Sequence, residues 1–471
     1  MHRFLANSEL PASAEHAWDW HVRPGAFERL APPWDPVETV GVEWRRPLVD
    51  GTRRELRLRF GPASVPWIAV HEGLVRGRQF VDRQERGPFG HWEHVHAFEP
   101  LSAGACRLED RIAYEPPSWA PDSLAAPATD RRLRRMFRYR HDQTRADLER
   151  HARFRERGPL AVAITGASGL VGRALAALLE GGGHRVVRVV RRTPAGLDEI
   201  SWDPAAGAIT PADWEGLDAV VHLAGESIAS GRWTAARKRA IRDSRVGPSA
   251  LLARTLAGLS RPPRVLVQAS AIGFYGDRGD EELDERAIPG EGFLPGVSVH
   301  WEDATASAAN AGIRVVLPRI GVVLTPAGGA LARMLPPMRA GLGGTLGSGR
   351  QWMSWISLDD LIGLIHEALF DERMAGPINA VAPEAVDNRR FTEQMAGVLG
   401  RPAFVPAPAV ALRLALGEMA DALLLASTRV VPARLTEIGF PYRHPRLEDA
   451  LRHVLGRHTN DGPVRFESAL P

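Results

Sequence analysis

A glycine-rich turn, Thr165-Gly166-Ala167-Ser168-Gly169-Leu170-Val171-Gly172, is the strongest chemical signal in the sequence. It follows a short apolar run and opens an alanine-rich apolar segment, which is the strand-turn-helix context that dinucleotide binding requires. Gly166 permits the tight turn, Gly169 lets the backbone approach a pyrophosphate, and Gly172 lets the helix pack against the strand. Free N–H groups at the helix N-terminus would face the phosphates, so the turn predicts a bound dinucleotide.

Two arginines stand where the second strand of this unit is predicted to end, in Val189-Val190-Arg191-Arg192. An NAD site usually has an acidic residue here, about 20 residues beyond the glycines, which accepts from the ribose 2′-hydroxyl. Arginine suits a 2′-phosphate instead, both as a charge and as a flat fork of donors. Arg191 and Arg192 therefore favour NADP(H) over NAD(H); the alternative is that one of them simply points to solvent.

A parallel sheet must position this turn, because strands and helices alternate from Leu160 onward. The segments between the predicted strands are helical in pattern, which implies a sheet covered on both faces. The fold class predicted here is an α/β Rossmann doubly wound parallel sheet over residues 160–400, with a small helical domain over 401–457 and a frayed tail over 458–471. The predicted strands are Leu160–Thr165, Arg185–Val190, Ala219–Leu223, Val265–Gln268 and Arg314–Leu317.

Further motifs along this part resemble the extended short-chain dehydrogenase/reductase superfamily. The similarity is closer to the NAD-dependent epimerase/dehydratase-like "epimerase family" proteins that end in a small C-terminal domain of unknown function. It covers about 300 residues. The motifs that carry it are His222–Glu226, Arg232–Thr234, Ser244–Val246, Ala269–Gly276, Trp301-Glu302 and Pro318–Leu324.

The resemblance implies a set of cofactor contacts, each at a position that matches a family motif. The diphosphate is expected on the glycine turn, the 2′-phosphate on the two arginines, the ribose and nicotinamide side beyond His222, and the nicotinamide end near Pro318. The residues implied are Gly166, Ser168, Gly169, Leu170, Val171, Gly172, Arg191, Arg192, Leu223, Ala224, Gly225, Ser270, Pro318 and Arg319.

The superfamily's usual Tyr-x-x-x-Lys pair, which passes a proton to the substrate oxygen as hydride moves, is missing. Lys238 is the only lysine, and Thr234 stands four residues before it. Tyr275 lies on a loop expected at the carboxyl end of a strand, where α/β ligands bind. We therefore expect Tyr275 as a substitute proton donor, with Ser270 orienting the substrate and Glu302 or Lys238 assisting. The alternatives are that Tyr275 packs beneath its loop and that Glu302 is only a first-turn acid.

Residues 1–157 have a different pattern, with six short β-rich runs followed by a long helix near Thr129–Arg155. Leu133, Phe137, Thr144 and Leu148 form one mostly apolar stripe along that helix. This order of elements resembles the START-like, polyketide-cyclase (SRPBCC) helix-grip fold, which implies an α+β domain around an apolar cavity and an apolar ligand. Seven of the 13 tryptophans lie in this part. They either line such a cavity or are ordinary core and edge residues.

Composition excludes several classes of protein. The net charge of +3 gives no argument for a nucleic-acid partner,. The single cysteine, Cys106, excludes an internal disulfide and a cysteine zinc cluster, and we predict no metal site,. No run of 18 apolar residues occurs and the first residues do not resemble a signal peptide, so the cytoplasm is the expected location.

Three functions remain open from the residues alone. The first is an NADP-dependent oxidoreductase or epimerase-like enzyme with an unusual proton donor and a small-molecule substrate. The second is an NADP-binding regulator or scaffold with little catalysis. The third is a carrier whose N-terminal cavity binds an apolar ligand that the Rossmann part modifies or senses. The missing Tyr-Lys pair separates the first from the second.

Overall fold

The computed structural model describes residues 1–35, 37–41, 43–60, 63–117, 119–196, 198–458 and 463–469. The chain forms two compact units. One comprises residues 1–159, 177–184 and 453–471, and the other comprises residues 160–176 and 185–452. Residues 459–462 and 470–471 of the predicted tail lie outside the described residues. No helix in the described ranges is long and apolar enough to cross a membrane.

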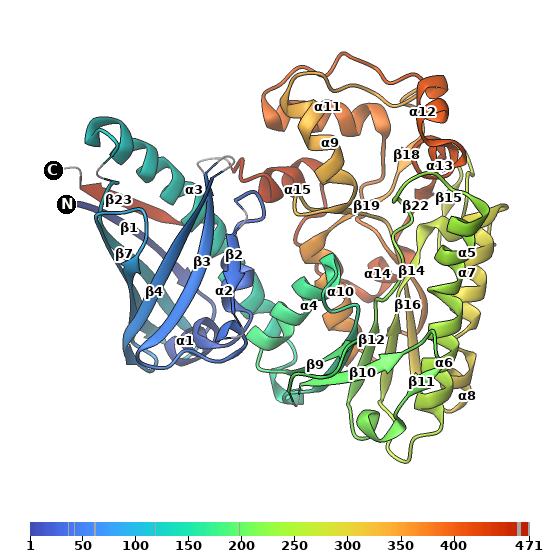
Figure 1. The fold of residues 1–471 in the computed structure, drawn as a ribbon, viewed down its shortest axis with the longest axis horizontal. Coiled ribbons are helices and arrows are strands. Elements are labelled where there is room, and N and C mark those ends of the chain that lie inside the picture. Colours follow the sequence, from blue (N-terminus) through green and yellow to red (C-terminus); the bar gives the residue numbers. More distant parts are fainter. Residues whose placement is uncertain are drawn as a thin grey trace. The chain divides into compact units, whose positions relative to one another are not determined.

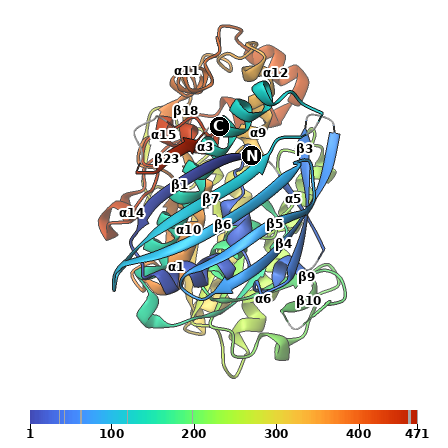
Figure 2. The same ribbon diagram turned by 90° about the vertical axis from the view of Figure 1, so that its left-hand side faces the viewer.

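The N-terminal unit is an antiparallel sheet with a long helix against it, as the helix-grip resemblance predicts. Eight strands can be followed in the described residues, in the order β2-β3-β4-β5-β6-β7-β1-β23, and Figure 2 shows most of them side by side. They are β1 (His2–Leu10), β2 (Val37–Val40), β3 (Thr52–Phe60), β4 (Ala63–Val75), β5 (Gln79–Arg86), β6 (His91–Ser102), β7 (Ala105–Glu115) and β23 (Arg465–Ala469), with helices α1 (Ala14–Val22), α2 (Ala26–Leu30) and α3 (Asp122–Ala152).

The stripe predicted on the long helix is the buried face of α3. Leu133, Phe137, Thr144 and Leu148 are each at most 3% exposed, because side chains three or four residues apart share one side of a helix. Helix α3 begins at Asp122, seven residues before the predicted start. The packing of this stripe on the sheet confirms the predicted fold of this unit.

Both ends of the chain correct the sequence analysis. Residues 2–10 were not predicted as a strand, yet they form β1, whose alternate residues are buried. The expectation of a frayed tail is wrong for Arg465–Ala469, which pairs antiparallel with β1 as β23. Val464 is 5% exposed and belongs to the apolar core of this unit. The side chains of Val464 and Phe466 pack against this core, while the backbone of the segment pairs with β1.

The second unit is the predicted Rossmann sheet. Its strand order is β11-β10-β9-β8-β12-β13-β16-β14, with β20 also on β16, which is the doubly wound order. Helices α5 to α8 lie together on one side of the sheet (Figure 1). The strands are β8 (Ala161–Thr165), β9 (Arg185–Val190), β10 (Glu199–Asp203), β11 (Ala208–Ile209), β12 (Ala219–His222), β13 (Val265–Gln268), β14 (Ser270–Ala271), β16 (Arg314–Ile320) and β20 (Gly376–Ala380).

Shorter strand pairs and the remaining helices complete the fold. The pairs are β15 (Glu282–Leu283) with β22 (Arg429–Val430), β17 (Val322–Leu324) with β19 (Trp355–Ser357), and β18 (Trp352–Met353) with β21 (Val386–Asp387). The helices are α4 (Leu170–Gly181), α5 (Ala235–Asp243), α6 (Val246–Ala257), α7 (Phe293–Asp303), α8 (Ala306–Asn310), α9 (Gly329–Arg339), α10 (Leu358–Phe370), α11 (Asn388–Leu399), α12 (Ala409–Leu416), α13 (Glu418–Ala420), α14 (Ala433–Ile438) and α15 (Leu447–Val454).

Candidate functional site

The turn between β8 and α4 needs glycine for three different reasons. Gly166 has a φ of +67°, a left-handed conformation that side chains disfavour,. A Cβ on Gly172 would lie 2.2 Å from the carbonyl oxygen of Gly166, so the helix packs on the turn only without a side chain there. A Cβ on Gly169 would meet that same oxygen at 3.1 Å and nothing else within 4 Å. The outer side of the turn is therefore open backbone.

This open backbone fits a diphosphate. Ser168 and Gly169 are exposed at the start of α4, and Leu170 and Val171 are half-buried behind them. The N–H groups of a first helical turn have no partner inside the helix, and the helix dipole favours negative charge at that end. Side chains at Gly169 and Gly172 would fill the cradle or push the helix away from it. The geometry thus matches the phosphate-binding role that the sequence predicts.

The two arginines after β9 have different surroundings. Arg192 donates from both terminal nitrogens to the carboxylate of Glu199, at 2.8 and 2.7 Å. Glu199 is buried and also accepts from the backbone N–H of Ala195 at 2.8 Å. Arg191 is exposed and makes no hydrogen bond within the described part of the chain. Arg192 therefore shapes the loop through Glu199, and Arg191 presents the available guanidinium.

A hydroxyl organises the end of β12, where Leu223, Ala224 and Gly225 follow. The Thr165 Oγ1 atom accepts from the backbone N–H groups of Leu223 and Ala224, at 3.1 and 3.2 Å. The same oxygen lies 2.6 Å from Nδ1 of His222. Full burial lowers the pKa of His222 to about 4, so the ring is neutral at pH 7 and the Thr165 hydroxyl donates to it. His222 is thus a support beneath the turn.

Ser270, Glu302 and Arg319 meet at the carboxyl end of the sheet. Ser270 Oγ donates to Glu302 Oε1 at 2.6 Å. Arg319 grips the same carboxylate with two nitrogens, Nε to Oε1 at 2.9 Å and Nη2 to Oε2 at 2.8 Å. The Arg319 and Glu302 side chains are only 4% and 10% exposed. A buried, doubly hydrogen-bonded ion pair therefore fixes the oxygen that the serine hydroxyl faces.

Tyr275 is fully buried, at 0% exposure. Its hydroxyl donates to Asn379 Oδ1 at 2.6 Å and accepts from Arg319 Nη1 at 2.9 Å. Burial raises the pKa of Tyr275, which opposes ionisation of the phenol. The structure therefore joins Tyr275 to the Ser270–Glu302 pair through Arg319, with the phenol on the far side of the guanidinium from the carboxylate.

Lys238 makes its contacts with other residues. It sits on α5, pairs with Glu418, and its ammonium lies 5.2 Å from the centre of the Phe293 ring. None of the contacts described for Lys238 is with Ser270, Tyr275 or Glu302. Pro318, the other residue expected near the nicotinamide, is buried in β16 and pairs with Ile378 of β20. Of the site residues predicted from the sequence, the structure therefore brings together Ser270, Tyr275, Glu302 and Arg319.

Two residues that sequence reasoning missed complete the site. Asn379 stands opposite Arg319 on the neighbouring strand β20, far along the chain, and no motif marks it. Glu199 follows Arg192 by seven residues. An acid at that distance from a predicted phosphate-binding arginine was a usable signal, because a nearby carboxylate competes with the phosphate for the guanidinium.

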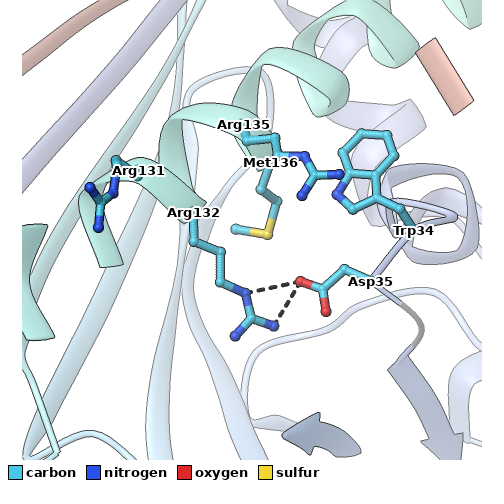
Figure 3. Close-up of a pocket in the computed structure, with 6 residues that line it drawn as sticks. All are labelled: Trp34, Asp35, Arg131, Arg132, Arg135 and Met136. Atoms are coloured by element: carbon cyan, nitrogen blue, oxygen red, sulfur yellow. Dashed lines mark hydrogen bonds and ion pairs between the residues drawn. The ribbon is translucent and has the colours of Figure 1, made fainter. Parts of the chain in front are cut away.

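A pocket of about 370 Å³ lies in the N-terminal unit beside α3 (Figure 3). Arg132 donates to Asp35 at 2.7 and 2.9 Å, and the Arg135 guanidinium lies 4.7 Å from the centre of the Trp34 ring. Three of its six lining residues are arginines, and the apolar cavity that the helix-grip resemblance implies stays a prediction. The lining residues are Trp34, Asp35, Arg131, Arg132, Arg135 and Met136.

Three family models match successive parts of the chain. The polyketide cyclase/dehydrase and lipid transport family matches residues 10–138, the NAD dependent epimerase/dehydratase family matches residues 162–379, and a domain of unknown function matches residues 407–454.

Relatives and solved structures agree with these matches. An epimerase family protein of Mycobacterium bovis is 44% identical over 63% of this chain and 98% of its own length. A crystal structure from Corynebacterium glutamicum, described as a nucleoside-diphosphate sugar epimerase, is 35% identical with a TM-score of 0.77 and covers 96% of this chain and 90% of its own. The human epimerase family protein SDR39U1, solved with NADPH, is 34% identical with a TM-score of 0.58, over 63% of this chain and 99% of its own.

The predicted resemblances are thus confirmed for both units. The glycine turn, the doubly wound sheet and the extended similarity to epimerase family proteins agree. The chain belongs to the NAD-dependent epimerase/dehydratase family.

Proposed function

We propose that the protein is an NADP(H)-dependent oxidoreductase or epimerase-like enzyme that acts on a small substrate through a carbonyl or hydroxyl group. Ser270 and Glu302 move the proton in place of the absent Tyr-Lys pair. The observation that carries the proposal is the 2.6 Å hydrogen bond from Ser270 Oγ to a carboxylate that Arg319 holds in place.

The cofactor assignment rests on the cradle and on Arg191. The open backbone at Gly169 suits the diphosphate, and the exposed guanidinium of Arg191 suits a 2′-phosphate,. The human relative solved with NADPH supports the same choice. Bound NADP(H) would exchange a hydride with the substrate carbon.

The proton follows a two-step relay. In the oxidation direction, Ser270 Oγ accepts the proton of the substrate hydroxyl and passes its own proton to Glu302. In the reduction direction, the same transfers run backward and deliver a proton to the carbonyl oxygen. Arg319 compensates the charge of Glu302 and keeps its Oε1 atom aimed at Ser270,.

Tyr275 is a positioning residue in this scheme. Its hydroxyl is saturated by Asn379 and Arg319, so it braces the guanidinium and does not reach the substrate. Lys238, paired with Glu418, has no part in the relay.

The experiment combines cofactor binding with turnover. NADPH and NADH affinities are measured by fluorescence on the full chain, and NADPH oxidation is followed over a library of small carbonyl compounds. Nucleoside-diphosphate sugars form a separate arm, assayed for epimerisation, because of the Corynebacterium neighbour. We expect tighter NADPH binding, and a loss of kcat of at least 100-fold in Ser270→Ala and Glu302→Gln with NADPH affinity kept.

Tyr275→Phe provides the contrast, because it keeps the Ser270–Glu302 pair. We expect it to lower kcat by less than 10-fold. If turnover survives in Glu302→Gln and disappears in Tyr275→Phe, Tyr275 is the proton donor and the proposed relay is wrong. Tighter binding of NADH would refute the role of Arg191.

A further inference from the structure

A cluster of histidine and aspartate side chains lies inside the N-terminal unit. Asp82 is on β5, and His94 and His96 are on the adjacent strand β6. Because side chains alternate along a strand, residues 94 and 96 point to the same face of the sheet. His94 is 2% exposed and His96 is 8% exposed, whereas the Asp82 side chain keeps 15% exposure.

The three side chains converge on one point. The Oδ2 atom of Asp82 lies 3.0 Å from His94 Nδ1 and 3.2 Å from His96 Nε2, and all three ligand atoms lie within 4.8 Å of one another. Around a tetrahedral zinc ion with bonds of 2.0 to 2.2 Å, ligand atoms stand about 3.4 Å apart. The two separations from Asp82 Oδ2 therefore suit a small divalent cation after shifts of a few tenths of an ångström.

The outward nitrogens of both rings are held by one carboxylate. Asp110 on β7 lies 2.8 Å from His94 Nε2 and 2.7 Å from His96 Nδ1 through its Oδ1 atom. Its Oδ2 atom lies 2.8 Å from Nε2 of His141 on α3, whose Nδ1 is 2.7 Å from the Ser8 hydroxyl. Metal-bound histidines almost always donate their second N–H to such a carboxylate, which fixes the tautomer and the ring orientation.

Carboxylate oxygens surround both imidazole rings. All four nitrogens of His94 and His96 face a carboxylate oxygen at 2.7 to 3.2 Å. The centres of the two rings are only 3.8 Å apart. A divalent cation beside Asp82 would bind the two nitrogens that face Asp82 and leave the other two nitrogens to donate to Asp110.

Aromatic side chains surround the place where Asp82, His94 and His96 meet. The ring of Phe80 stacks on His96 at 4.2 Å, and Phe137 meets His94 edge-on at 5.3 Å. The second oxygen of Asp82 accepts from Trp92 Nε1 at 3.4 Å, which leaves Oδ2 for the cation. Arg140 also lies near both carboxylates.

We propose that Asp82, His94 and His96 bind one Zn²⁺ ion in the N-terminal unit, with Asp110 as the shared support of both histidines and one coordination position left for a water or ligand oxygen. Two imidazoles and a carboxylate form the type of ligand set that leaves a zinc ion open to exchange. Of the three ligands, Asp82 has the most exposed side chain. This proposal replaces the expectation from the sequence that the protein has no metal site.

The test uses the full chain without a histidine tag. The protein is stripped with a chelator, incubated with Zn²⁺, desalted and analysed for metal, and Co²⁺ is titrated in parallel as a spectroscopic probe. Wild-type protein is expected to show visible Co²⁺ bands that Zn²⁺ abolishes. Asp82→Asn and His96→Gln should lose both, and Asp110→Asn should weaken affinity by about 10- to 100-fold. The matched control is His91→Gln on the same strand, which should bind like the wild type.

A second measurement needs no variant, and so does not depend on whether the variants fold. In Co²⁺-loaded wild type, proton NMR should show two strongly shifted, exchangeable N–H signals, from His94 and His96 toward Asp110. Their absence, or zinc affinity unchanged in a folded Asp82→Asn variant, would overturn the proposal and leave the cluster as a metal-free ion-pair network.

Discussion

Ser270 and Arg319 stand opposite each other on the adjacent parallel strands β14 and β16, and both bind the carboxylate of Glu302. Asn379 continues the same register on β20 and binds Tyr275. Three neighbouring strands thus place their polar side chains in one row at the carboxyl end of the sheet. The row explains how a chain without the usual Tyr-Lys pair still holds a serine beside a fixed acid.

Removal of one partner of the buried ion pair should destabilise the fold. Arg319→Met leaves the Glu302 carboxylate buried without its main counter-charge, which costs about 3–5 kcal/mol. The double variant Arg319→Met with Glu302→Leu should lose less than the sum of the single changes, because no unpaired charge remains. Urea unfolding of the three variants measures both values. Additive losses would show that the two residues are not coupled.

Arg191 should set the preference for NADPH. Arg191→Ala removes the exposed guanidinium and should raise the Kd for NADPH by about 10-fold or more, with the Kd for NADH unchanged. Arg192→Ala serves as the comparison, since Glu199 already engages that side chain, and should change the ratio of the two affinities less. Fluorescence titrations with both cofactors decide the point, and equal effects of the two variants would contradict the distinction.

Substitutions of two glycines in the turn should have different effects, one mainly on the stability of the fold and the other mainly on NADPH binding. Gly172→Ala places a methyl group 2.2 Å from the Gly166 carbonyl oxygen, so α4 must move, at a cost of about 1–3 kcal/mol. Gly169→Ala meets only one atom, at 3.1 Å, and should leave Tm nearly unchanged while it weakens NADPH binding. Thermal unfolding and cofactor titration of both variants test this contrast, which a large Tm loss in Gly169→Ala would rule out.

His222 should make the fold sensitive to acid. Burial lowers its pKa from 6.5 to about 4, so the unfolded chain binds a proton here before the folded one does. Stability is therefore complete above pH 6.5 and falls as the pH drops toward 4, by about 3 kcal/mol at most. His222→Asn, whose amide oxygen can accept from Thr165, should flatten this part of the pH profile. Identical profiles for both proteins would remove His222 as the cause.

Local pattern was enough to predict most of the fold. The predicted strands Arg185–Val190 and Val265–Gln268 have the same bounds as β9 and β13, because valine and leucine are the main residues of both segments, as is usual in buried parallel strands. β1 was missed, since its alternation is interrupted by small and polar residues such as Ser8. β23 was missed because five residues carry little pattern by themselves, and their pairing with β1 is a long-range contact.

The site was predictable only where a motif is local. The glycine turn follows from spacing, whereas the row of Ser270, Arg319 and Asn379 depends on which strands become neighbours. Arg319 was expected at the nicotinamide end, and its bond to Glu302 follows from the packing of α7 beside β14. The Asp82, His94 and His96 cluster escaped notice because its three members lie on two strands and share no continuous motif.

The pairing of β23 with β1 has a consequence for biosynthesis. The N-terminal unit contains residues from both ends of the chain, so β1 keeps an unpaired edge while the ribosome makes the several hundred residues in between. Unpaired strand edges invite pairing with other chains. A nascent chain of this protein is therefore most vulnerable to chaperone capture or aggregation in the interval before β23 emerges.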